Sequence, residues 1–118
     1  MVDHARARRL GERIKVLVAE ALVEEVKDPD LGFVTITDVR VTPDLMHAKI
    51  YYTVLGSEAE QEVTTGVLLK NQGRLRGAIG RQLGIRLTPT IELISDRVPE
   101  AAGALDELLP RRSAGIKR

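Results

Sequence analysis

The sequence predicts a single domain of the α+β class, in which the elements follow one another as helix, strand, strand, helix, helix and strand. Its 118 residues, 43% hydrophobic and 30% charged, suffice for one hydrophobic core and are typical of a globular chain. The apolar spacing switches between the period of a helix and the two-residue period of a strand. The first two strands are joined by a short turn and the third follows two helices, so a right-handed crossover should cover one face of the sheet.

The first helix is expected over residues 5–27. It ends before Pro29, because the residue that precedes a proline is driven out of the α region. Its apolar stripe at helical spacing consists of Leu10, Ile14, Leu17, Val18 and Ala21.

A β-hairpin should follow this helix. Residues 33–41 are rich in β-branched side chains, and a bulge near Thr37 and Asp38 would explain why their alternation slips. The turn at Pro43 leads into a second strand, residues 47–54. The core-facing side chains of that strand are expected to be Ala48, Ile50, Tyr52 and Val54.

The second half begins with a helix whose start has the pattern of a capping box, Ser57 and Glu60. This helix is expected to kink at Asn71, Gln72 and Gly73 and then continue toward a third strand over residues 85–94. Pro99 should open a short last helix that ends near Leu109. We therefore expect one domain over residues 1–109 and a basic, disordered tail over residues 110–118.

Composition excludes several classes of function. The chain has no cysteine, which rules out disulfides, thiolate metal sites and cysteine nucleophiles. Its two histidines, His4 and His47, have no carboxylates at metal-ligand spacing, and no nucleophile with its base or phosphate-binding loop is recognisable. We therefore expect no bound metal, no cofactor and no small-molecule substrate. We also expect no enzymatic activity. Without a signal peptide or an apolar run near 18 residues, the protein is expected to be soluble and cytoplasmic.

The charges are segregated although the formal net charge is only +1. Residues 70–86 carry five basic and no acidic side chains, and residues 1–18 carry five basic and two acidic ones. Such asymmetry creates a local positive field, although solvated helix faces are the ordinary explanation of charge runs.

Four glycines stand beside the second basic run, namely Gly73, Gly77, Gly80 and Gly84. Four helix-interior glycines would destabilise a helix by about 3–4 kcal/mol relative to alanine, so a close approach to the backbone is expected. Either a polyanion or a neighbouring helix could make that approach. The GxxG pattern at residues 77–80 also matches an RNA-clamping loop, but its position favours a helix.

An RNA interface would use cations that replace counterions on phosphates. Arg76 lies nearer the apolar face and has a structural role as its alternative. The candidate RNA-binding residues are Arg6, Arg8, Arg9, Arg13, Lys70, Gly73, Arg74, Arg76, Gly77, Arg81 and Arg86.

Three runs of sequence carry a resemblance to a known family. Residues 34–50 read VTITDVRVTPDLMHAKI, residues 73–76 read GRLR, and residues 83–93 read LGIRLTPTIEL. Together they resemble the ribosome-binding factor A family, from about residue 5 to residue 109 of this chain.

The resemblance implies a KH-like domain of type II, with a kinked helix at an Ala-x-Gly element in place of a GxxG loop. Here Asn71 replaces the alanine, and asparagine also tolerates unusual backbone angles. The resemblance further implies a non-enzymatic factor that binds the immature 30S subunit and its 16S rRNA and assists late assembly and 5′-end processing. Separately, we expect the protein to be a monomer. Two alternatives are a KH-like module for a different RNA and a protein-interaction domain.

Overall fold

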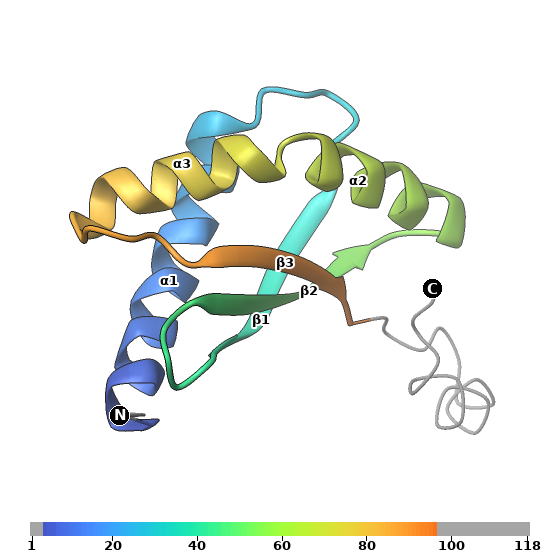
Figure 1. The fold of residues 1–118 in the computed structure, drawn as a ribbon. Helices are drawn as coiled ribbons and strands as arrows, with labels where there is room; N and C mark the ends of the chain where they lie inside the picture. Colours follow the sequence, from blue (N-terminus) through green and yellow to red (C-terminus); the bar gives the residue numbers. More distant parts are fainter. Residues whose placement is uncertain (1–3, 97–118) are drawn as a thin grey trace, which may run out of the picture.

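The computed structural model describes residues 4–96, and their elements occur in the predicted order (Figure 1). They are α1 (His4–Glu25), β1 (Phe33–Val41), β2 (His47–Leu55), α2 (Glu58–Lys70), α3 (Gln72–Leu83) and β3 (Thr90–Ser95). The α+β class is thereby confirmed. The expected helix from Pro99 to Leu109 and the basic tail at 110–118 lie outside the described residues.

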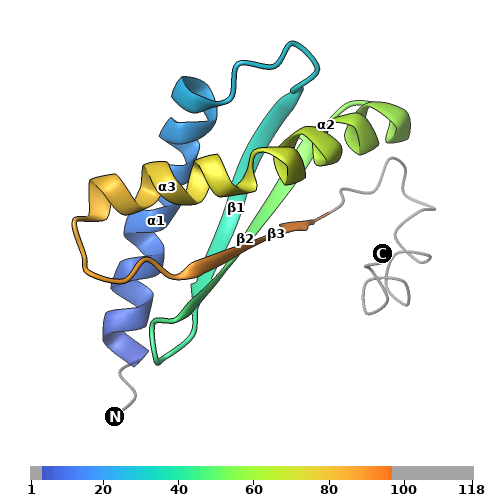
Figure 2. The same cartoon turned by 45° about the horizontal axis from the view of Figure 1, so that its top comes forward.

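The three strands form one sheet in the order β1-β2-β3. β1 and β2 pair antiparallel as a hairpin, whereas β3 pairs parallel to β2. A parallel connection needs a crossover, and α2 and α3 supply it. The inward side chains of β2, α1, α2 and α3 join in one core cluster, so the helices share one face of the sheet (Figure 2).

The predicted bulge in β1 is present. The register of β1 against β2 shifts between Ile36 and Asp38, which leaves Thr37 as the extra residue. Because the bulge reverses the alternation, both Val34 and Val39 pack against the core.

The core forms where the expected apolar stripes meet. Ile14 of α1, Ile50 of β2 and Leu75 of α3 are fully buried. Tyr52 is buried as well, and its hydroxyl lies 3.0 Å from Thr65 Oγ1 of α2, which satisfies the polar end of the ring.

The start of α2 has the predicted capping box. Glu60 N–H donates to Ser57 Oγ at 3.2 Å, and Ser57 N–H donates to Glu60 Oε1 at 2.7 Å. Hydrogen bonding to the Glu60 carboxylate by the Ser57 backbone first, and then by the Ser57 side chain, lowers the pKa of Glu60 because it favours the ionised form.

Two predicted boundaries were wrong. α1 ends at Glu25, two residues early, and β3 begins at Thr90 rather than at residue 85. Gly84 adopts the left-handed conformation at φ 64°, which ends α3 and opens a loop over residues 84–89. In this loop the carbonyls of Thr88 and Pro89 accept hydrogen bonds from Arg76 instead of pairing in the sheet.

Candidate nucleic-acid interface

The break between α2 and α3 falls on Asn71, within the expected kink. Its backbone has φ −103° and ψ 11°, and its N–H still donates to carbonyls of the last turn of α2. Its side-chain amide donates to Val67 O at 2.8 Å. Gln72 fixes the new direction, since its Nε2 donates to Ile91 O of β3 at 2.8 Å. Gly73 lies inside α3, beyond the break.

A shallow groove of about 530 Å³ runs between the outer face of α3 and the loop over residues 84–89. Three glycines of α3 line it along the helix, and the loop provides the other side. The lining residues are Gly73, Arg76, Gly77, Gly80, Arg81, Arg86, Leu87 and Thr88.

The glycines of this region have three different roles. A Cβ at Gly73 would meet nothing within 4 Å, and one at Gly77 only Arg81 Nη1 at 3.6 Å. A packed helix therefore explains neither of them. A Cβ at Gly80 would lie 2.5 Å from Thr88 Oγ1, so Gly80 lets the loop approach α3. Only Gly84 needs a positive φ, and it ends the helix instead of lying within it.

Residues 77–80 lie within α3, which confirms the helix interpretation of their GxxG pattern.

Arg76 takes the structural role that was its alternative. Its Nε donates to Pro89 O at 3.0 Å, and its Nη2 donates to Thr88 O at 2.7 Å. Both hydrogen bonds fasten the loop to α3, so Arg76 positions one wall of the groove.

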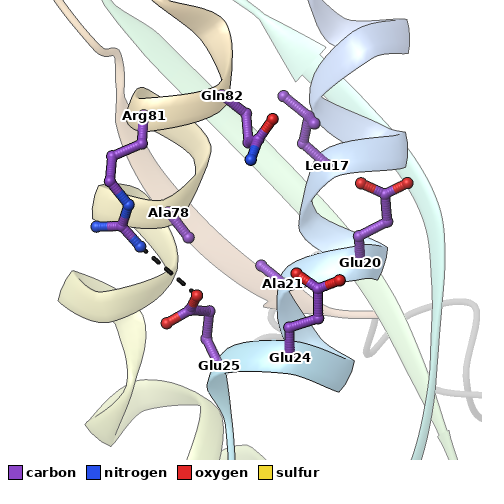
Figure 3. Close-up of a pocket in the computed structure, with 8 residues that line it drawn as sticks. All are labelled: Leu17, Glu20, Ala21, Glu24, Glu25, Ala78, Arg81 and Gln82. Carbon is purple, nitrogen blue, oxygen red and sulfur yellow. Dashed lines mark ion pairs between the residues drawn. The ribbon is translucent and has the colours of Figure 1, made fainter.

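Two of the predicted cations are held by acidic side chains near the end of α1. Lys70 Nζ lies 3.5 Å from Asp28 Oδ2, and Arg81 Nη2 lies 3.5 Å from Glu25 Oε2. Arg81 also lines a second hollow, between α3 and α1, together with Glu20 and Glu24 (Figure 3). The sequence showed acidic residues here but nothing that placed them beside the cations.

Arg74 and Arg86 are exposed and have no hydrogen bond or ion pair with other residues of the 4–96 region. Arg86 lines the groove, and Arg74 follows Gly73, which lines it too. These two side chains are available to a phosphate without losing an intramolecular partner.

One arginine of α1 forms a hydrogen bond with α3. Arg13 Nη2 donates to Gln82 O at 3.1 Å and satisfies a carbonyl of the last turn of α3. Arg9 lies one turn before Arg13 on the same side, whereas Arg8 is turned away by about 140° at 100° per residue. Arg6 lies seven residues before Arg13, within about 20° of it at 100° per residue, so Arg6, Arg9 and Arg13 share one side of α1.

Within the described part of the chain, no group of three or more histidine, cysteine or acidic side chains is placed to hold a metal ion. None of the described helices is both long and apolar enough to cross a bilayer.

The fold is therefore a KH-like α+β domain, and its groove has the chemistry of a surface for anions. The chain belongs to the ribosome-binding factor A family, whose family model matches residues 6–109. It is similar to ribosome-binding factor A of Clavibacter michiganensis, at 52% identity over 120 residues, covering 99% of this chain and 72% of that protein. Renibacterium salmoninarum has a similar protein, with 56% identity over 110 residues, 92% of this chain and 75% of the relative.

Solved structures agree with this assignment. The solution structure of a Thermotoga maritima protein described as a putative ribosome-binding factor A has a TM-score of 0.69 at 30% identity, covering 86% of this chain and 97% of that one. A homology model of Thermus thermophilus ribosome-binding factor A, fitted into the cryo-EM map of a complex with the 30S subunit, has a TM-score of 0.63 at 25% identity, and the match covers 75% of this chain and 92% of that one. The predicted KH-like fold is confirmed by these neighbours.

Proposed function

We propose that this protein is a maturation factor that binds the immature 30S subunit through its 16S rRNA and assists late assembly and processing of the rRNA 5′ end. Membership of the ribosome-binding factor A family supports the proposal. So does the similar Thermus thermophilus factor, which was fitted into a map of a 30S complex.

The observation that carries the proposed interface is the groove on α3. Its floor is bare helix backbone at Gly73 and Gly77, and cations stand on both sides of it. A sugar-phosphate chain can approach such a floor closely and place its phosphates beside Arg86 and Arg74. The glycines and the unpaired arginines then have one common explanation.

Recognition should depend on phosphates and shape more than on bases. The chain has two tyrosines, one phenylalanine and no tryptophan, and single-strand readers usually stack bases on aromatic rings. Tyr52 is buried in the core and cannot serve. Contacts to phosphates position a protein on folded RNA without reading its sequence.

The proposed factor acts by occupying its site, without catalysis, cofactor or small-molecule substrate. We place it in the cytoplasm, where it binds as a monomer and needs no membrane. Sedimentation equilibrium of the free protein tests the monomer.

The double variant R74Q/R86Q tests the interface. We expect its affinity for purified free small subunits to fall roughly tenfold to a hundredfold, because two charge-assisted contacts to phosphate are lost. The slope of log affinity against log salt should flatten by about 1 for each lost contact. Gradient co-sedimentation over a salt series measures both quantities.

The matched control is K15Q/K49Q, which removes the same charge from exposed lysines of α1 and β2 that do not line the groove. Equal losses in the two double variants would show that net charge matters and the groove does not. A loss of binding to every RNA alike, including unrelated RNA, would favour a general RNA-binding module.

Processing is tested separately in a bacterium depleted of its own ribosome-binding factor A. Expression of this chain should restore the mature 5′ end of the 16S rRNA, read by primer extension, and R74Q/R86Q should restore it less. Normal subunit binding with no gain of mature ends would refute the processing role alone.

A further inference from the structure

Acidic residues at and just after the end of α1 form ion pairs with two of the candidate RNA-binding cations. Glu25, in the last turn of α1, pairs with Arg81 of α3, and Asp28, three residues later, pairs with Lys70 at the end of α2. Both pairs join segments that are distant in sequence. Each pair also places an acid beside a cation that the sequence predicted to bind phosphate.

These pairs are built so that they can be exchanged. Each joins its charged atoms at 3.5 Å, longer than the 2.7–2.9 Å typical of charge-assisted hydrogen bonds. The cationic side chains are 71% exposed in Lys70 and 67% exposed in Arg81. A phosphate offers a guanidinium or ammonium group the same kind of oxygen acceptor as a carboxylate. An incoming phosphate can therefore reach either cation from solvent and replace its acid.

We propose that Glu25 and Asp28 are internal competitors of RNA phosphate for Arg81 and Lys70, and that they limit the affinity of the interface. This inference rests on the proposed function, because it concerns the regulation of that same surface. The free protein keeps these two cations occupied, and binding exchanges a carboxylate for a phosphate at each. Dissociation reverses the exchange, so the acids favour release of the factor.

A neighbouring acid, Glu24, serves as a control that distinguishes the proposed exchange from a general effect of removing negative charge. Glu24 precedes Glu25 and lines the same hollow between α1 and α3, but it pairs with none of the described cations (Figure 3). E24Q and E25Q remove the same charge from adjacent positions of one helix turn. Only E25Q releases Arg81.

The experiment compares the two variants in binding to purified free small ribosomal subunits, measured by fluorescence anisotropy near 0.1 M salt, where the Debye length is about 10 Å. We expect E25Q to bind about twofold to fivefold more tightly than E24Q, the range that exposed ion pairs contribute. D28N should likewise bind small subunits more tightly than its control D30N. Asparagine keeps the Oδ1 that accepts the Asp30 N–H at 2.9 Å, so the turn is retained.

The same comparison in an R81Q background identifies the cause. There the advantage of E25Q over E24Q should disappear, because no guanidinium remains to be released. Equal affinities of E25Q and E24Q in the otherwise native protein would overturn the inference, as would an advantage that persists with R81Q. R81Q by itself tests whether Arg81 contacts the RNA. If R81Q leaves subunit binding unchanged, Arg81 is not part of the interface; if R81Q weakens binding while E25Q and E24Q bind equally, only the competition by Glu25 is refuted.

Discussion

Gly11 of α1 and Gly77 of α3 are both helix-interior glycines, yet the fold explains only one of them. A Cβ at Gly11 would lie 2.9 Å from the backbone oxygen of Val39, so α1 can lie against β1 only where a side chain is absent. A Cβ at Gly77 would meet only the tip of Arg81, at 3.6 Å. Glycine weakens a helix interior equally in both places. The packing of the domain explains Gly11, whereas no close contact within residues 4–96 explains Gly77.

The largest expected effect is that of G11A. Its methyl group must push α1 away from a backbone atom that cannot rotate aside, and overpacking of this kind exceeds the gain in helix propensity. We expect the free energy of unfolding to fall by about 1–2 kcal/mol in urea denaturation. A stabilised G11A protein would show that the contact between α1 and β1 relaxes easily, and the contrast with Gly77 would disappear.

G77A should have the opposite effect on stability. With room for the methyl group, the free energy of unfolding should rise by about 0.8–1 kcal/mol, while affinity for free small subunits falls a few-fold because the methyl group covers the backbone. The control is G66A in α2, where a Cβ also meets nothing within 4 Å but no groove is lined. G66A should gain the same stability with unchanged binding. Equal subunit affinities of G77A and G66A would show that the groove floor at Gly77 does not contact the RNA.

The smallest expected effect is the loss of folding stability at acidic pH. Hydrogen bonds from Arg40 first, and then from the Val39 backbone, lower the pKa of Asp38, and the capping box lowers the pKa of Glu60. A carboxyl whose folded pKa is lowered binds fewer protons in the folded state than in the unfolded one. Its stabilisation is present above the unfolded pKa and is lost as the pH falls through the folded value.

Stability should therefore be steady between pH 7 and about pH 5 and should decline below it. The difference between G11A and G77A, which involves no titrating group, should stay constant over this range. Thermal unfolding across the pH series checks both statements. A difference that changes with pH would mean that charge, and not packing, separates the two glycines.

Local pattern was sufficient for most of the fold. Helical and alternating spacing predicted the order of elements, the capping box at Ser57 and the bulge at Thr37, because each of these depends on a few neighbouring residues. The start of β3 was wrong for the opposite reason. Residues 85–89 have the composition of a strand, but a side chain from α3, that of Arg76, takes two of the carbonyls near their end.

The candidate site was predictable only in outline. The sequence identified the basic run and its glycines, and the structure places Gly73, Gly77, Arg81 and Arg86 around one groove. The sequence alone could not show which cations already have partners, because the partners are distant along the chain. Lys70 pairs with Asp28, and Arg13 donates to the carbonyl of Gln82. Charge counting treats all these cations alike, whereas tertiary contacts separate the engaged from the free.

The two hydrogen bonds of Arg76 have a consequence for the kinetics of recognition. Because they fix the loop against α3 in the free protein, the width of the groove is set before the proposed RNA partner binds. A binding groove that is already in its bound shape loses little conformational entropy on binding. Association should then be limited by diffusion and orientation, with no slow folding step in between.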